Sequence, residues 1–446
     1  MPESRADSAR QRPVVIATLG THGDVRPIIA LALGLQRRGY PVRVLTSSNF
    51  ETFIRANGLE FFPLSGDLQQ LLKDHPDVAE MRGAPGILRK KLLEWARDWP
   101  AQSSAACADA GLILGVGSAS LLVHSLGEAY GVPVAFAQLQ PLTESRHLPL
   151  MLLPNLRLPG RVSVALHRTM RFMCWQLMRP AVNGIVRPAL GLPGYPWSGP
   201  DRSALRVIYG YSAHVCPRPP DWPESAQVCG FWQLPRSQWQ PPAALQAFLQ
   251  AGPPPLYFGF GSMTSSAVAQ LTATVKAAVR LTGQRALLAS GWGGLGAGDA
   301  AAADDADDAE RFFHLEQEPH DWLFPRVSVA VHHGGAGTSG AALAAGIPSV
   351  VLPFGYDQSF WAYCLAQRGV APPGLARAGL QPETLAAAIQ QASKPAMRAA
   401  AQALGQRIRA EHGVRNAVDQ LEAWQLLKPT AVTPAAAARP AQHAIA

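Results

Sequence analysis

The feature that most restricts the fold is a regular alternation of short apolar segments with helix-compatible ones along the 446 residues. Residues 13–20 (PVVIATLG) are apolar, rich in β-branched side chains and end in glycine, and a helix-compatible stretch begins at Pro27. A second apolar run follows at 41–47 and a second helical pattern at 50–58. This order predicts a parallel sheet with helices on both faces.

The alternation stops once and then restarts. Prolines and tryptophans crowd together between residues 216 and 242, where hydrophobic periodicity disappears, as is typical of a linker. A chain of this length also exceeds the ~250–300 residues that one hydrophobic core organises. We therefore expect a flexible N-terminus over 1–12, a first domain over 13–215, a linker over 216–242, a second domain closed by helices over 243–428, and a disordered tail over 429–446.

One segment of the first domain breaks the rhythm. Residues 148–194 are basic and rich in aromatic residues and methionine. Helices that cover the sheet would explain this composition, and so would a surface that faces a lipophilic acceptor or a membrane. The sequence leaves both interpretations open.

Charge and cysteine usage limit the partners and the compartment. The formal net charge of +8 favours anionic partners, but the basic residues are spread along the chain, so we expect no nucleic-acid partner. The five cysteines form no CxxC pair, which predicts neither a zinc site nor a disulfide framework. With no apolar leader and no long apolar run, we expect a cytoplasmic protein, with peripheral contact to the inner face of the plasma membrane as an option.

The sharpest motif is VAVHHGGAGTSGAALAAG, residues 329–346, in which an apolar strand runs into glycines and then into an alanine-rich helix. Glycines allow close approach of a ligand, and a helix N-terminus offers unpaired N–H groups to phosphate. The motif is neither a Walker A loop nor GxGxxG, which disfavours kinases and dehydrogenases. A glycine-rich turn chosen for packing is the alternative interpretation.

The neighbours of the motif favour a diphosphate site. His333 can donate to a phosphate oxygen, and Thr338 can both cap the helix and donate its hydroxyl. Asp357 and Gln358 follow the next apolar run, where side chains at strand ends gather around ligands and can hydrogen-bond sugar hydroxyls.

These motifs, together with GTHGDVRP at residues 20–27, FGFGSM and SGWGGL in the middle, and PFGYDQSFWA after the glycine motif, extend over nearly the whole chain. In combination they resemble the nucleotide-sugar-dependent glycosyltransferases, the family that includes sterol, antibiotic and plant secondary-metabolite glycosyltransferases. The resemblance implies an α/β GT-B fold, in which two Rossmann-like domains face each other across a cleft. It also implies inversion at the anomeric carbon without a metal ion or cofactor.

The resemblance assigns the donor site residue by residue. It implies diphosphate binding by Ser262, His333, Gly335, Gly337 and Thr338, and sugar binding by Asp357 and Gln358. Gln317 and Glu318 stand where the family places its nucleobase platform, and Trp292 is a further aromatic candidate for that role.

Two residues compete for the role of catalytic base, His22 and Asp24. Histidine titrates near ~6.5 without perturbation, whereas aspartate titrates near ~3.9 and must be raised by burial or transfer its proton in the transition state. The resemblance nevertheless places the base at Asp24, with His22 as helper or acceptor contact. The alternative roles are an N-cap for Asp24 and a loop hydrogen bond for His22.

The sequence thus predicts a hexosyltransferase that moves a sugar, glucose from UDP-glucose by preference, to a hydroxyl of a lipophilic acceptor such as a sterol, lipid or polyketide. The alternatives are a dTDP-sugar-dependent antibiotic glycosyltransferase, a nucleotide-sugar 2-epimerase and a noncatalytic helper with the same fold. The presence of all the diphosphate residues disfavours the helper.

Overall fold

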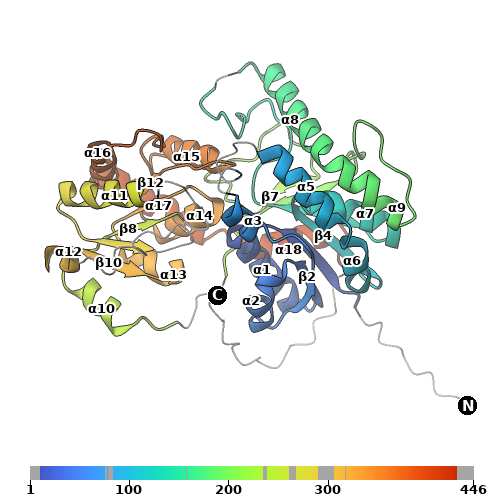
Figure 1. Ribbon diagram of the computed structural model, residues 1–446, viewed down its shortest axis with the longest axis horizontal. Helices are drawn as coiled ribbons and strands as arrows, with labels where there is room; N and C mark the ends of the chain where they lie inside the picture. The colour runs from blue at the N-terminus through green and yellow to red at the C-terminus, as the bar shows by residue number, and fades with distance from the viewer. Residues whose placement is uncertain are drawn as a thin grey trace, which may run out of the picture.

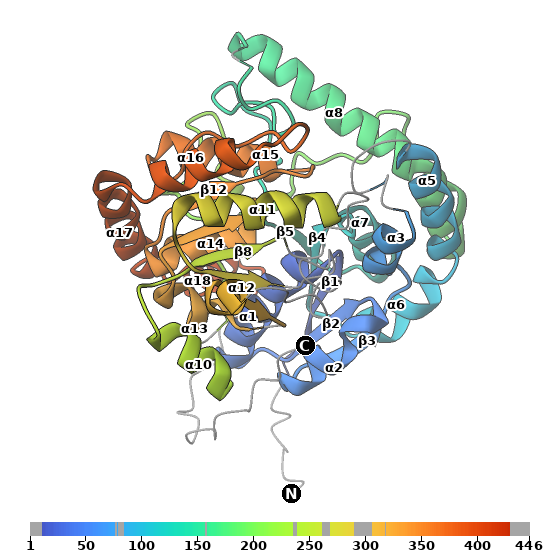
Figure 2. The same ribbon diagram turned by 60° about the vertical axis from the view of Figure 1, so that its left-hand side comes forward.

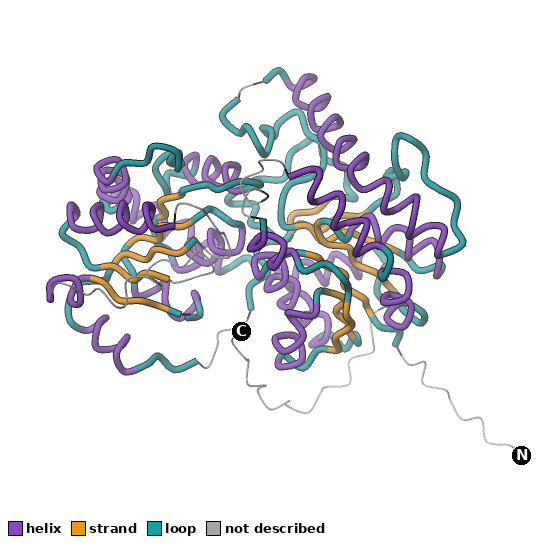
Figure 3. Tube along the Cα trace, viewed as in Figure 1, coloured by secondary structure: helices purple, strands orange, loops and turns teal. Residues whose placement is uncertain are grey.

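The computed structural model describes residues 11–75, 78, 84–156, 158–234, 239–260, 268–289, 306–316 and 318–428. Two α/β units lie side by side, each with a parallel sheet between helices (Figures 1 and 3). The expected fold class, two Rossmann-like domains, is confirmed.

The first sheet has the strand order β3-β2-β1-β4-β5-β6-β7, and all neighbouring strands are parallel. Alternate residues of the interior strand β1 enter different cores, with Ile16 in one cluster and Val15 in the other. The sheet is therefore buried on both faces. Its strands are β1 (Val14–Leu19), β2 (Val42–Thr46), β3 (Glu60–Pro63), β4 (Leu112–Gly117), β5 (Val134–Gln138), β6 (Arg206–Tyr209) and β7 (Ala226–Val228).

Helices on both sides cover this sheet, and the long helix α8 lies along the outer edge of the molecule (Figure 2). The helices of this part of the chain are α1 (His22–Arg37), α2 (Glu51–Ala56), α3 (Leu68–Asp74), α5 (Ala84–Ala96), α6 (Trp99–Cys107), α7 (Ser120–Tyr130), α8 (Gly160–Ala181) and α9 (Arg187–Ala189).

The second sheet has the order β10-β9-β8-β11-β12 and is also parallel throughout. Its strands are β8 (Leu256–Gly259), β9 (Ala286–Ala289), β10 (Phe312–Leu315), β11 (Val329–His332) and β12 (Ser349–Val351). The helices that follow the linker are α10 (Ala243–Gln250), α11 (Val268–Thr282), α12 (Ala306–Arg311), α13 (His320–Leu323), α14 (Ala336–Ala345), α15 (Gln358–Gln367), α16 (Pro382–Ala392), α17 (Pro395–Arg409) and α18 (Gly413–Ala423).

The chain crosses between the domains twice, because α18 returns to the first domain. Val418 and Leu421 of α18 are buried in the same core as Ile16. The guanidinium of Arg38, just after α1, binds the carboxylates of Asp419 and Glu422. The closing helices expected at the end of the second domain exist as α17 and α18, but α18 closes the first domain rather than the second.

The linker also differs from the prediction for 216–242. Residues 226–228 form β7, the edge strand of the first sheet, and Arg218 ties this segment together through the backbone carbonyls of Trp222, Pro223 and Ala226. The proline- and tryptophan-rich composition of this segment predicted no strand. The strand β7 exists because its backbone pairs with β6. After Cys229 the chain runs between the domains, with Trp232 buried in the core of the first and Gln233 Nε2 donating to the carbonyl of Gly340 in the second.

The two crossings touch each other at two glycines. A Cβ added to Gly413 would lie 2.5 Å from the carbonyl carbon of Gly230 and 2.5 Å from the carbonyl oxygen of Phe231. Gly230 itself has a φ of 103°, which favours glycine.

We expect Gly413→Ala to lower the free energy of unfolding by about 1–3 kcal/mol, because backbone atoms rather than a side chain must move to accept the methyl group. Gly86→Ala is the matched control. Gly86 also lies in a helix, and a Cβ there would meet no described atom within 4 Å, so helix propensity alone predicts a gain of up to about 1 kcal/mol. Urea unfolding of both variants checks this, and equal stability of the two would contradict it.

Candidate active site

A cleft of about 1510 Å³ separates the two domains and is lined by both. In the first sheet the strand order reverses between β1 and β4, and in the second between β8 and β11. Ligands of open parallel sheets bind at such reversal points, beyond the carboxyl ends of the strands. Both points open into the same cleft, since Leu19, Gly117, Gly259 and His333 all line it.

Helix α1 brings the first predicted pair into the cleft. It begins at His22, with Thr21 as its N-cap, and not at Pro27 as expected from the sequence. Pro27 is the sixth helical residue, and its missing N–H leaves the carbonyl of Gly23 without an intrahelical donor. The motif GTHGDVRP is thus the first turns of a helix rather than a loop before one.

Asp24 is the third residue of α1 and folds back onto the N-cap. Its Oδ2 accepts a hydrogen bond from the backbone N–H of Thr21 at 2.9 Å. Burial raises the pKa of the Asp24 carboxyl to about 6, against the lowering effect of the Thr21 hydrogen bonds, and the Asp357 carboxylate adds to the rise. Thr21, and not Asp24, is the N-cap residue. Asp24 is the third helical residue, and its carboxylate accepts the hydrogen bond from the N-cap N–H.

His22 lies in an aromatic corner of the same cleft. Its ring meets Phe50 edge-on at 5.0 Å between centroids, with Phe53 at 6.4 Å. Burial and the nearby Arg26 guanidinium lower the pKa of His22. Its buried Nδ1 has no hydrogen-bond partner among the described residues, so the loop hydrogen bond considered from the sequence does not form at that atom.

Helix α14 faces α1 with its N-terminus. Its N-cap is Gly335, so no side chain caps the N–H groups of the first turn. Thr338 is the third residue of the helix and lines the cleft, so the expected capping by its hydroxyl is wrong. The glycine motif therefore presents free backbone donors and the positive end of a helix dipole to the cleft.

His333 and Gly335 depend on each other. A Cβ on Gly335 would lie 2.5 Å from Nε2 of His333, so only glycine leaves room for the ring. Burial lowers the pKa of His333 to about 4, which keeps the ring neutral near pH 7. Its Nδ1 is buried without a partner among the described residues. The neighbouring His332 instead serves the backbone, accepting from the Gly334 N–H at 3.0 Å.

Gly337 has no packing neighbour that demands a glycine. The nearest described atom to a Cβ there is the carbonyl oxygen of Gly23, at 3.9 Å across the cleft. The residue is exposed. A methyl group at this position would therefore fit without a clash, on a residue that lines the cleft.

Asp357 and Gln358 line the same cleft and are held by fixed hydrogen bonds. Asp357 Oδ2 accepts from the indole N–H of Trp361 at 2.8 Å, and burial raises the pKa of Asp357. The amide oxygen of Gln358 accepts from the N–H groups of Phe354 (2.7 Å) and Gly355 (3.2 Å). The preceding Tyr356 has a φ of 56°, an unusual strained conformation for tyrosine.

Of the predicted nucleobase residues, Glu318 lines the cleft, and burial raises the pKa of its carboxyl. Trp292 and Gln317 lie outside the described residues, as does Ser262 of the predicted diphosphate set. Their roles stay predictions. In the part of the chain that the structure describes, no group of three His, Cys, Asp or Glu side chains could hold a metal ion.

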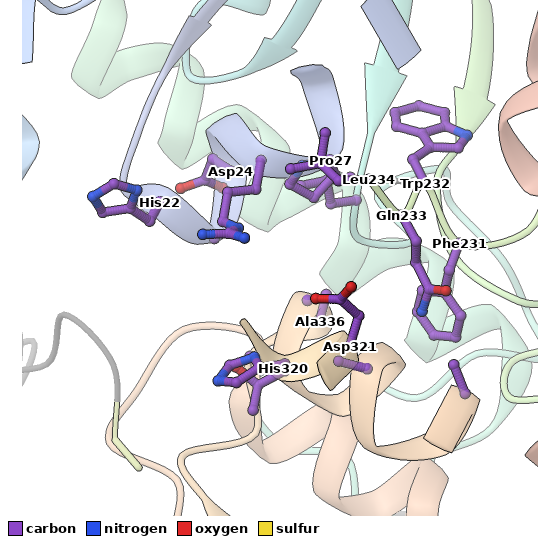
Figure 4. Close-up of a pocket in the computed structure, with 18 of the residues that line it drawn as sticks. His22, Asp24, Pro27, Phe231, Trp232, Gln233, Leu234, His320, Asp321 and Ala336 are labelled. Atoms are coloured by element: carbon purple, nitrogen blue, oxygen red, sulfur yellow. The ribbon is translucent and has the colours of Figure 1, made fainter. Parts of the chain in front are cut away.

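Sequence reasoning missed His320, Asp321 and Arg26, which also line the cleft. Figure 4 shows His320, Asp321 and Ala336 on one side, opposite His22 and Asp24 on the other. The ring of His320 stacks on Phe324 at 4.4 Å, and its Nε2 lies 3.1 Å from the hydroxyl of Tyr257. Burial, with Arg26 and His333 nearby, lowers the pKa of His320 to about 3. Burial lowers the pKa of Arg26, and the Asp321 carboxylate opposes this.

Two family models match the chain. The Glycosyltransferase family 28 N-terminal domain matches residues 14–148, and the Erythromycin biosynthesis protein CIII-like C-terminal domain matches residues 315–424. The first match includes Asp24, and the second includes the glycine motif and Asp357.

Curated relatives include sterol 3-beta-glucosyltransferase UGT80B1 of Arabidopsis thaliana, 32% identical over 94% of this chain and 69% of that protein. The sterol 3-beta-glucosyltransferase of Neosartorya fischeri is 31% identical over 92% of this chain, but the match spans only 29% of the fungal protein. The fungal relative is thus much longer than the region matched.

Solved structures share the fold. The glycotransferase of kitacinnamycin superposes with a TM-score of 0.67 at 19% identity, covering 94% of this chain and 100% of that one. Spinosyn rhamnosyltransferase SpnG complexed with thymidine diphosphate gives 0.61 at 19% identity, covering 92% and 100%.

The raised pKa of Asp24 predicts how stability depends on pH. Because the folded carboxyl binds its proton more tightly than the unfolded one, the free energy of unfolding should fall as pH rises from about 4 to about 6 and level off above. Asp24→Asn removes this dependence. At pH 4 the variant should match the wild type, and at pH 8 it should be more stable by at most about 3 kcal/mol, from two pKa units at ~1.4 kcal/mol each.

Urea unfolding at both pH values measures this difference, and Asp74→Asn, at an exposed aspartate, is the control. A variant less stable than the wild type at pH 8 would show that the contact with Thr21 outweighs burial.

Proposed function

This chain belongs to the family of glycosyltransferases that includes the sterol 3-beta-glucosyltransferases, and from this we propose that it transfers glucose from UDP-glucose to the hydroxyl of a sterol-like acceptor, with inversion. One observation carries the proposal: the cleft places Asp24 of the first domain opposite the uncapped N-terminus of α14.

In the proposed reaction Asp24 takes the proton from the acceptor hydroxyl. The acceptor oxygen bonds to the anomeric carbon while the bond from that carbon to the diphosphate oxygen breaks. A carboxyl with a pKa of about 6 is ionised at pH 7 and is a stronger base than an ordinary aspartate. The product is a glucoside with a protonated Asp24 and free UDP.

The second domain would stabilise the departing charge. The N–H groups at the start of α14 and the neutral ring of His333 would donate to the diphosphate, a fixed electrostatic arrangement that needs no covalent step. Glu318 would take part in the nucleoside site, while Asp357 and Gln358 would hold the glucosyl hydroxyls. We include no metal ion in this proposal.

Inversion is supported by the arrangement of the two helices. A single displacement needs the nucleophile and the leaving group on opposite sides of the anomeric carbon. Asp24 on α1 and the diphosphate donors on α14 lie on opposite walls of the cleft, which fits a sugar held between them (Figure 4).

A second candidate is transfer from a dTDP-sugar to a polyketide. It is favoured by the match of residues 315–424 to a domain named after an erythromycin biosynthesis protein, and this range holds the predicted diphosphate and sugar residues His333 to Gln358. Binding of UDP against dTDP distinguishes the two donors.

The proposal is tested by incubating the protein with UDP-glucose and a sterol in detergent and analysing the product by mass spectrometry and proton NMR. We expect a β-glucoside, and kcat/KM that falls about tenfold per pH unit below pH 6, where Asp24 becomes protonated. Asp24→Asn should lower kcat by about a hundredfold or more, and His22→Ala by much less. The opposite order would make His22 the base, and no glucoside from any sterol would reject the acceptor class.

Gly337→Ala tests the diphosphate site separately from catalysis. The methyl group has room in the unliganded protein, so stability should be unchanged or higher, but it would occupy the space where the diphosphate approaches. In the wild type, UDP at a hundredfold its Kd should stabilise the native state by about 2.7 kcal/mol, measured as a thermal shift. The shift should disappear in Gly337→Ala and persist in Gly86→Ala. A full shift in Gly337→Ala would place the diphosphate elsewhere.

A further inference from the structure

Exposed apolar side chains are concentrated on one part of the first domain. Of the ten large apolar side chains that are exposed in the described part of the chain, eight fall between residues 142 and 197. We call this set the α8 surface: Leu142, Leu153, Leu156, Val162, Met170, Phe172, Met173 and Trp197. Met173 and Trp197 are the most open, with 61% and 62% of their area exposed.

Helix α8 lacks cover in its middle. Residues 168–174 are seven consecutive exposed positions, so no side of these two helical turns is buried. The helix runs along the periphery and extends past the sheets (Figures 1 and 2). Helices in water depend on packing of an apolar face for most of their stability. A helix that exposes Met170, Phe172 and Met173 instead is suited to contact something outside the chain.

The charge around this surface is mainly positive, with the carboxylates of Glu144 and Asp221 as exceptions. Between Glu144 and Asp201 the sequence holds no Asp or Glu and seven Arg. Arg187 is buried against Glu128, but Arg161 is exposed. Arg168 and Arg171 share the single carboxylate of Glu144, which leaves a net positive charge beside the apolar side chains.

Trp197 adds an amphipathic group at the edge of the surface. The guanidinium of Arg179 lies 4.1 Å from its ring centroid, and its backbone carbonyl accepts from the indole N–H of Trp175 at 2.9 Å. The exposed indole is thus fixed in place next to a cation. Tryptophan beside arginine is typical of helices and loops that lie in the head-group region of a bilayer.

We propose that the α8 surface docks on an anionic lipid bilayer, with its apolar side chains between the lipid head groups and its arginines on the lipid phosphates. Apolar area and positive charge would contribute together, at about 1 kcal/mol for each basic residue near an anionic surface. A second copy of the chain would have to face the same positive charge, which disfavours self-association through this surface.

The α8 surface also lies on the side of the cleft that belongs to the first domain. Helix α8 packs on α5, Ile87 of α5 packs against the cluster of Leu72 and Val78, and Leu72 lines the cleft. A continuous path of packed elements thus links the α8 surface to the cleft. The docking inference stands on exposure and charge alone and does not depend on the proposed sugar donor or acceptor.

Vesicle sedimentation tests the proposal with the full chain. We expect the wild type to bind vesicles of phosphatidylcholine with 30% phosphatidylglycerol, and to bind pure phosphatidylcholine weakly. Raising salt from 0.1 to 1 M shortens the Debye length from ~10 to ~3 Å and should release much of the protein. Met173→Glu should lower the partition coefficient about tenfold, equivalent to ~1.4 kcal/mol.

Matched controls separate this surface from general effects. Leu281→Glu makes the same kind of change at a leucine of the second domain with 54% of its area exposed and should leave vesicle binding unchanged. Arg161→Glu should weaken binding, whereas Arg398→Glu, at an exposed arginine of α17, should have less effect. Thermal unfolding confirms that the variants fold, and UDP binding in solution reports the donor site independently.

Three results would overturn the proposal: no vesicle binding by the wild type, equal binding by Met173→Glu, or a wild-type dimer that Met173→Glu turns into a monomer. The last would assign the α8 surface to self-association. If the wild-type protein bound no UDP, the proposed function would be rejected, but the vesicle-binding result would be unaffected.

Discussion

The face-to-face approach of α1 and α14 is the constraint on which the site depends. Each helix follows a strand at the point where its own sheet reverses order, so each domain alone carries half of a site. The approach is close: the Gly23 carbonyl oxygen on one helix lies 3.9 Å from the Cβ position of Gly337 on the other. The effect of the Asp357 carboxylate, which adds to the rise in the pKa of Asp24, exists because the two walls meet.

Local sequence was sufficient for the elements and for part of the site. The strand that ends at His332 and the uncapped helix after Gly335 follow from residue types that act within a few positions of each other. The start of α1 was not predicted correctly. Proline is common in the first helical turn, so the sequence suggested that the helix begins at Pro27. The carboxylate of Asp24, paired with Thr21, begins the helix five residues earlier than that.

The sequence did not predict contacts between residues that are far apart along the chain. His320 is marked in the sequence by no motif, and it enters the site through its packing on Tyr257 and Phe324. Likewise, α18 looked like a helix of the second domain, because its amphipathic pattern specifies an apolar face but not the sheet that the face covers. Arg26 belongs to the motif GTHGDVRP, but its electrostatic partner, Asp321, lies almost three hundred residues later in the chain.

The contact between Gly230 and Gly413 has a mechanical consequence. Two segments join the domains, and they touch where neither has a side chain. Beside this contact the domains share a buried apolar cluster, in which Tyr211 of the first domain packs edge-on against Trp361 of the second. Any change in the width of the cleft would therefore have to move backbone atoms at the two glycines and repack this shared cluster. The spacing between Asp24 and Gly337 is thus tied to contacts that lie outside the site.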